Sequence, residues 1–149
     1  MFEDKHAKIS LLAARFRKAI ETCPKAKLPI TFQHFPRGSC GDAALLLAKY
    51  LEENKIGQFN YMLGRRDDHS HAWLQNNTVI VDITGDQFPE MEHSVFVGTT
   101  SSWHEEFNGE ILHVADFELY DPHTRHSLKS AYHLILDAIN ASKAEIDSL

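Results

Sequence analysis

The clearest chemical feature of this chain is a cysteine placed where a helix is expected to begin. Cys40 lies in the segment 38–42, directly before an apolar run that predicts a buried helix. We expect this helix to start at Ser39, a favourable N-cap, and to run to about Asn54. The first N–H groups of a helix lack partners, and the helix dipole is positive at that end, so an anion is stabilised there. Because the thiolate is the reactive form of cysteine, we expect Cys40 to act as a nucleophile.

A histidine and an aspartate that could activate this thiol follow on two predicted strands. His71 lies in a strand over 69–75, and Asp82 lies in a strand over 78–83. Asn76-Asn77 separates the strands and favours a two-residue turn, which would place His71 directly opposite Asp82. Asp82 would then orient the imidazole. His71 would hold Cys40 as a thiolate and pass a proton to the leaving group.

Attack on a carbonyl carbon also creates an oxyanion that needs hydrogen-bond donors. The backbone N–H of Cys40 is the first donor that we expect. Gln33, Trp73 and Gln87 are the candidates for a second donor or for contact with the substrate. For Trp73, packing in the core is the favoured interpretation.

The high histidine content leaves two other interpretations open. His69 shares a strand face with His71 and competes with it as the base, but His71 is favoured by its pairing with Asp82. His69, His71, Cys40 and Asp82 could also converge on Zn²⁺. No C-x-x-C or H-E-x-x-H spacing supports such a site, so we expect neither a metal nor another cofactor.

Several residues of chemically active types are expected to have ordinary roles. His104 lies in a segment, 98–110, that is predicted to form a long loop, and such loops often carry function in compact domains. His104, His123 and His126 are nevertheless expected at the surface. Cys23 has no neighbours that would activate it, and we expect it to be structural.

The remaining patterns predict the elements that would position these residues. Apolar residues at helical spacing predict the first and last helices, and β-favouring runs predict further strands. The helices are predicted over 3–22 and about 123–146, and these strands over 58–63, 94–97 and 111–114. Helices at both ends of a run of strands predict an α+β fold, with helices packed on an antiparallel sheet.

Composition indicates one globular domain over residues 1–149, with 43% hydrophobic and 24% charged residues. The formal net charge of -6 argues against a nucleic-acid partner, since phosphate binding requires clustered Lys and Arg. No apolar run approaches the ~18 residues that span a bilayer, so no membrane partner is expected. The absence of a signal-peptide pattern and the two cysteines favour a cytoplasmic location; export without a cleavable signal stays open.

Three short motifs together resemble the core of the transglutaminase-like superfamily, which has a papain-like fold. They are Gly38-x-Cys40-x-Asp42-x-Ala44-x-Leu46, His71-Ala72-Trp73 and Val81-Asp82-Ile83-Thr84. They occur in the family's order and on the expected elements, over roughly residues 36–88. The resemblance implies a Cys40–His71–Asp82 catalytic triad and thiol chemistry on an acyl or amide carbon.

Departures from the family pattern favour one class of activity. The chain is much shorter than most transglutaminases, no segment resembles a calcium loop, and Ile83 stands where many members have proline. These differences favour a hydrolase, either a peptidase or a glutamine deamidase, that acts on a protein or peptide amide. The same triad order occurs in arylamine N-acetyltransferases and toxin deamidases. Acyl transfer to an amine and a catalytically silent binding module of the same fold therefore remain alternatives.

Overall fold

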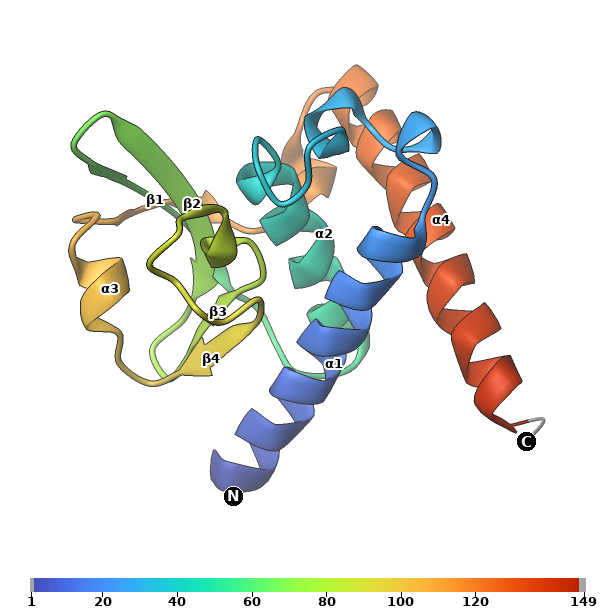
Figure 1. Ribbon diagram of the computed structural model, residues 1–149, viewed down its shortest axis with the longest axis horizontal. Helices are drawn as coiled ribbons and strands as arrows, with labels where there is room; N and C mark the ends of the chain where they lie inside the picture. The colour runs from blue at the N-terminus through green and yellow to red at the C-terminus, as the bar shows by residue number, and fades with distance from the viewer. Residues whose placement is uncertain (1, 148–149) are drawn as a thin grey trace.

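The computed structural model describes residues 2–147, and this part of the chain has an α+β fold (Figure 1). Five strands form one antiparallel sheet in the order β4-β3-β2-β1-β5. The strands are β1 (Asn60–Arg66), β2 (His69–Gln75), β3 (Ile80–Asp82), β4 (Phe96–Gly98) and β5 (Glu110–Val114). The α-helices are α1 (Phe2–Thr22), α2 (Cys40–Glu53), α3 (Ser102–Glu105) and α4 (Pro122–Asp147).

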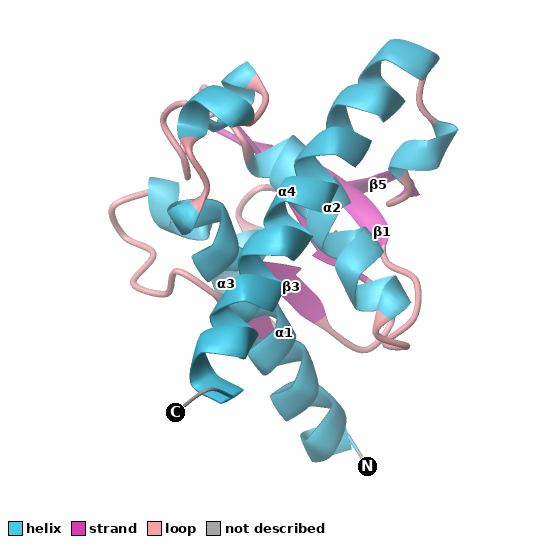
Figure 2. Cartoon of the chain, turned by 90° about the vertical axis from the view of Figure 1, so that its right-hand side faces the viewer, coloured by secondary structure: helices cyan, strands magenta, loops and turns pink. Residues whose placement is uncertain are grey.

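The helices other than α3 form a layer against one side of the sheet. Figure 1 shows α1, α2 and α4 beside one another, with the sheet on the far side of α2, and in Figure 2 α4 and α1 stand in front of the strands. α2 is apolar on nearly all sides because α1 and α4 cover one flank and β2 covers the other. No helix within residues 2–147 is long and apolar enough to cross a membrane.

Most predicted elements are confirmed, with small changes at their ends. The helix predicted over 3–22 is α1, the one predicted from Ser39 is α2, and the last predicted helix is α4. The segment 98–110 differs from the prediction, because it forms α3 rather than a continuous loop. The Ser101 hydroxyl accepts a hydrogen bond from the His104 backbone N–H and so caps this helix, which is too short to show helical periodicity.

Alternation along the strands creates an apolar layer on each face of the sheet. One layer packs on the helices and includes Leu74, Val81 and Ile83. The other lies beneath α3 and consists of Met62, Trp73, Ile80, Phe88 and Phe107, with Phe96 and Trp103 against it. Side chains two residues apart share a face, so His71 and Asp82 belong to this second layer and are withdrawn from solvent.

The register between β2 and β3 differs by two residues from the predicted one. Gln75 pairs with Ile80 and Leu74 with Val81, so His71 is not directly opposite Asp82. The turn is shifted because the Asn76 side chain accepts hydrogen bonds from the backbone N–H groups of Thr78 and Val79. A shift of two keeps every side chain on its predicted face. His71 and Asp82 therefore become diagonal neighbours, which long side chains can bridge.

A buried arginine on α1 fixes the chain just after β3. Arg17 donates hydrogen bonds to the Ile83 carbonyl at 2.7 Å and to the Ser94 carbonyl at 3.2 Å. It also binds Asp86 through two hydrogen bonds, of 2.7 and 3.0 Å. Since Asp86 lies in η3 (Gly85–Gln87), this one side chain ties the helical layer to the segment that follows Asp82.

Replacing this arginine is expected to destabilise the whole fold. Arg17→Met removes several charge-assisted hydrogen bonds and leaves Asp86 without its cation, so we expect the free energy of unfolding to fall by about 2–4 kcal/mol. Urea denaturation measures this change. Lys18→Met, at an exposed position of the same helix, is the control and should stay within about 0.5 kcal/mol of the original protein. Equal stability of the two variants would show that Arg17 is not a tie between the layers.

Candidate active site

The first residue of α2 is the cysteine that the sequence singles out. Cys40 is partly exposed, whereas Ser39 before it is buried. We expected Ser39 to cap the helix, but its hydroxyl donates to the Pro36 carbonyl at 3.2 Å and makes no capping bond. The N–H groups of the first turn are therefore not occupied by this side chain. They belong to the helical turn that Cys40 begins, and the start of a helix is a position where a thiolate or an oxyanion is stabilised.

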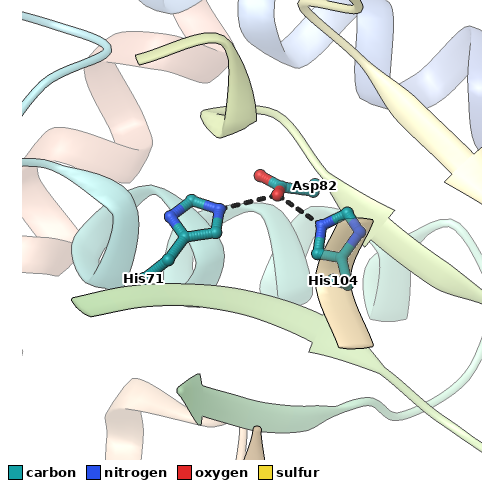
Figure 3. Close-up of side chains that lie close together, drawn as sticks. All are labelled: His71, Asp82 and His104. Carbon is teal, nitrogen blue, oxygen red and sulfur yellow. Dashed lines mark hydrogen bonds and ion pairs between the residues drawn. The ribbon is translucent and has the colours of Figure 1, made fainter. Parts of the chain in front are cut away.

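A buried carboxylate lies at the centre of the site, between two imidazoles (Figure 3), and accepts four hydrogen bonds in all. Asp82 is 3% exposed. Its Oδ2 accepts from Nε2 of His71 and Nε2 of His104, each at 2.7 Å. Its Oδ1 accepts from the Thr84 backbone N–H at 2.9 Å and from the Thr84 hydroxyl at 3.4 Å. These four donors match the acceptor capacity of an ionised carboxylate.

The imidazole of His71 is fixed by contacts on its edges and faces. Nε2 bonds to Asp82, and Nδ1 is 2.9 Å from Nε2 of Gln87. Phe88 and Trp103 meet the ring edge-on at centroid distances of 5.4 and 5.6 Å. The ring is completely buried, so its orientation is set by the protein and not by solvent.

The thiol and the imidazole favour each other's charged form. Burial would raise the pKa of the Cys40 thiol, but a hydrogen bond and positive charge from His71, with the Ala72 backbone N–H, lower it below its ordinary value. Burial would lower the pKa of His71, but Asp82 and Cys40 raise it to about 9. A thiolate–imidazolium pair is the state that these contacts favour at neutral pH.

The carboxylate stays ionised in spite of its burial. Burial alone would raise the pKa of Asp82, whereas the hydrogen bonds from His104 and His71 hold it far below its ordinary value. A buried carboxylate that stays charged can fix the tautomer of His71 and stabilise the imidazolium.

His104 is the residue that the sequence analysis placed wrongly. It is 2% exposed and bonds Asp82, although we expected it at the surface with His123 and His126, which are exposed. The difference arises because α3 folds over the sheet and turns this side chain inward. Ser101 is a favourable N-cap residue and could have predicted α3, but it does not predict the contact of His104 with Asp82.

The rival histidine does not approach the carboxylate in the structure. His69 is exposed at the start of β2 and packs against Phe88, with ring centroids 5.9 Å apart. His71 is therefore the member of the pair that bonds Asp82. The predicted grouping of His71 with Asp82 is present, and the sequence interpretation that preferred His71 to His69 agrees with it.

The three candidate donors for the oxyanion occupy different surroundings. Trp73 is buried, and its indole N–H donates to Gln75 at 3.0 Å, which fits the core role that was favoured. Gln87 lies against Nδ1 of His71, and its amide can donate to the neutral ring or accept from the charged ring by a flip. Gln33 is exposed on the loop before α2, and the structure does not connect its side chain to the triad.

A tyrosine that the sequence analysis did not consider borders the cysteine. The hydroxyl of Tyr61, on β1, lies only 2.5 Å from where a Cβ on Gly41 would be, so a larger residue at this position would collide with the ring. Burial, followed by the charge of Cys40, raises the pKa of Tyr61 well above its ordinary value, so its hydroxyl keeps its proton. The His113 ring stacks on the Tyr61 ring at a centroid distance of 4.9 Å. Nε2 of His113 is also 2.9 Å from the Tyr120 hydroxyl, with which it shares a hydrogen bond.

The same cluster contains groups that could bind a metal ion. His71, Asp82 and His104 place their ligand atoms within 4.8 Å of one another. Both nitrogen-to-oxygen distances are 2.7 Å, which suits hydrogen bonds, whereas two ligands of one tetrahedral zinc ion lie about 3.3 Å apart. Cys40 and His69, the other predicted ligands, are not in this cluster. The arrangement of His71, Asp82 and His104 fits three hydrogen-bonded side chains better than a zinc site.

The space beside the cysteine is a crevice and not a cavity. It lies between α2 and strands β2 and β3, with Cys40, Ala72 and Asp82 among its lining residues, and it is too narrow to hold a water molecule. A groove of about 640 Å³ runs between α1 and the end of α4, and Cys40, His71 and Asp82 are not among its lining residues. Small-molecule sites typically have volumes of ~300–1,000 Å³, so the crevice at Cys40 is not a site of this kind.

Comparison with known proteins finds no match: no family model fits the chain, and no curated protein or solved structure is significantly similar to it. The interpretation of the site therefore depends on its own geometry.

The depressed pKa of Asp82 predicts how stability depends on pH. A carboxyl whose pKa is lower in the folded state stabilises the fold above its unfolded pKa of about 3.9, and this stability is lost as pH falls below that value. Asp82→Asn should lower the free energy of unfolding at neutral pH by on the order of 3 kcal/mol and weaken the loss in acid. Denaturation from pH 3 to 7 measures both effects.

Asp68→Asn, in the exposed turn between β1 and β2, is the matched control for the loss of one carboxylate. It should leave both the stability and its acid dependence nearly unchanged. An acid dependence in Asp82→Asn as steep as that of the original protein would contradict the assignment of this stability to Asp82.

Proposed function

We propose that the protein is a thiol hydrolase that cleaves or deamidates an amide bond through a Cys40–His71–Asp82 triad and a thioester. The observation that carries the proposal is the buried His71–Asp82 pair beside a partly exposed thiol at the start of α2. The contacts of His71 and Ala72 with Cys40 support its activation as a nucleophile.

The proposed reaction has two halves that share one oxyanion site. The Cys40 thiolate attacks the amide carbon, and the tetrahedral oxyanion collapses to a thioester as imidazolium His71 gives its proton to the departing amine. His71 then takes a proton from water, which attacks the thioester. Collapse of the second oxyanion breaks the C–S bond, releases the acid and restores the thiolate–imidazolium pair. The backbone N–H groups at the start of α2 are suited to stabilise both oxyanions.

The arrangement of the elements supports a transglutaminase-like, papain-like fold for this proposal. In that fold a helix begins with the nucleophile and packs on an antiparallel sheet that carries the histidine and the carboxylate. Here α2 begins with Cys40 and packs on β2, which carries His71, while Asp82 ends β3. The three sequence motifs and the arrangement of these elements therefore both support the proposal that the chain belongs to this superfamily.

The lack of a cavity at the cysteine favours a protein or peptide substrate. The crevice beside Cys40 is too narrow to enclose a small molecule, whereas an exposed segment of a protein can meet the partly exposed thiol from outside. Tyr61, which borders Cys40, and Gln87, which contacts His71, are partly exposed and are suited to contact such a segment. A glutamine side chain or a peptide bond are the two amides that we propose.

Reactivity of the cysteines tests this proposal without a known substrate. With iodoacetamide at pH 6–7, Cys40 should be alkylated about tenfold or more faster than a small free thiol, because its lowered pKa increases the fraction present as thiolate. His71→Ala should remove this advantage and move the acidic limb of the pH–rate profile to higher pH. Labelling is followed by mass spectrometry in a Cys23→Ser background, which leaves one thiol.

His69→Ala is the matched control, since it removes an exposed histidine from the same strand. This variant should be alkylated as fast as the original protein. If Cys40 reacts like an ordinary thiol and does not respond to His71→Ala, the proposed function is wrong, and a silent binding module of this fold becomes the better interpretation.

Mass spectrometry of a protein substrate would identify the reaction. Deamidation raises the mass of a glutamine-containing peptide by about one dalton, proteolysis breaks the chain, and transfer joins the acyl group to an added amine. Cys40→Ala should abolish whichever change is seen. Persistence of the change in that variant would contradict a thioester on Cys40.

A further inference from the structure

We propose that His104 is a positioning residue for the triad, which holds the Asp82 carboxylate in place and thereby keeps the His71 imidazole aligned with Cys40. The inference depends on the proposed function, because alignment has a consequence only if the thiol reacts. It extends that function by assigning a role to α3, an element outside the three sequence motifs.

A chain of short hydrogen bonds connects α3 to the triad. Nε2 of His104 donates to Asp82 Oδ2 at 2.7 Å, and that oxygen also accepts from Nε2 of His71 at 2.7 Å. At its other end, Nδ1 of His104 is 2.6 Å from the Ser101 hydroxyl. The four side chains are all buried, and Figure 3 shows the two imidazoles on either side of the carboxylate.

The serine determines which nitrogen of His104 carries the proton. The Ser101 oxygen already accepts from the His104 backbone N–H at 3.1 Å, so its own hydrogen is free to point at Nδ1. Nδ1 then accepts, and the proton of the neutral ring is on Nε2, directed at Asp82. Ser101, the residue that caps α3, thus directs the Nε2–H of His104 toward the carboxylate.

Aromatic packing prevents the His104 ring from turning away. Trp103 and Trp73 meet the ring edge-on at centroid distances of 4.8 and 5.0 Å, and Phe96 packs at 5.2 Å. A ring that served only to fill space could be replaced by an apolar side chain. His104 instead directs an N–H at a buried negative charge, where a hydrogen bond has its largest effect.

The direction of its effect on the thiol follows from electrostatics. The positive end of the His104 N–H dipole points toward the triad, whose thiolate–imidazolium–carboxylate state carries one net negative charge. Removing this donor disfavours the more negative state of the site, so loss of the first proton from the Cys40–His71 pair requires a higher pH.

The other groups that act on this pair come from three strands. Cys40 on α2 faces His71 of β2, the Asp82 carboxylate at the end of β3, and Tyr61 of β1. Asp82 faces both His71 and His104. The His104 ring also packs against the His71 ring, at a centroid distance of 6.3 Å, but its hydrogen bond to this group of residues goes to Asp82. The comparison of His104→Leu with His104→Gln therefore tests the path through Asp82.

The test is the pH–rate profile of Cys40 alkylation by iodoacetamide, measured on the full chain with Cys23→Ser. His104→Leu should move the acidic limb upward by about half a pH unit or more, and should lower the rate at neutral pH about ten- to a hundredfold. His104→Gln places an amide N–H near the position of Nε2, so it should restore most of the original profile.

Two further variants separate positioning from loss of packing. Ile80→Ala opens a cavity in the same apolar layer without touching the hydrogen bonds, and it should lower stability but leave the acidic limb in place. Ser101→Ala keeps the imidazole and removes its Nδ1 partner, so it should move the limb in the same direction as His104→Leu by a smaller amount. If His104→Leu does not fold, Ser101→Ala by itself tests the positioning role of His104.

The possible outcomes distinguish this inference from the proposed function. A slow, ordinary thiol in the original protein would refute the proposed function itself. A fast thiol whose acidic limb stays in place in His104→Leu, or in Ser101→Ala should the first variant not fold, would refute only the positioning role. A limb that moves equally in Ile80→Ala would also refute it, since packing alone would then explain the shift.

Discussion

The burial of one charged carboxylate constrains the rest of this structure. Removing Asp82 from water has a large energetic cost unless hydrogen bonds compensate for its charge. Donors from β2, α3 and the segment after β3 all converge on it, and each must be placed to within a few tenths of an ångström. The sheet, the short helix α3 and the turn at Thr84 are therefore mutually dependent: each supplies a donor that makes burial of the charge possible.

The two layers of the sheet divide structural and chemical roles. The layer against the helices is purely a core, in which Leu74 and Val81 pack near α2. The layer beneath α3 is aromatic, and it surrounds His71 and Asp82 with a medium of low polarity in which hydrogen bonds and charge pairs are strong. Cys40 lies at the border of these layers, where the helix start remains partly open to solvent. In the proposed mechanism, Cys40 therefore meets the substrate at this opening while His71 and Asp82 stay buried.

The sequence predicted the strand faces better than it predicted the register. Alternating apolar residues placed His71 and Asp82 on one face, and a shift of two residues leaves faces unchanged. The Asn76-Asn77 pair favoured a turn centred on those residues. The side chain of Asn76 instead accepts hydrogen bonds from Thr78 and Val79 and moves the turn by one position. The position of the turn therefore depends on which side-chain hydrogen bonds form, and residue types alone do not predict this.

Residue types and local periodicity by themselves determined the α+β order of elements, the helix that begins at Cys40 and the grouping of His71 with Asp82. These features are local, because a helix start or a strand face depends on residues a few positions apart. Only the tertiary structure brought His104 to the carboxylate and Tyr61 to the cysteine. Those contacts join segments that are far apart in the chain. They depend on the paths of the loops and on the packing of α3, and no local sequence pattern encodes either.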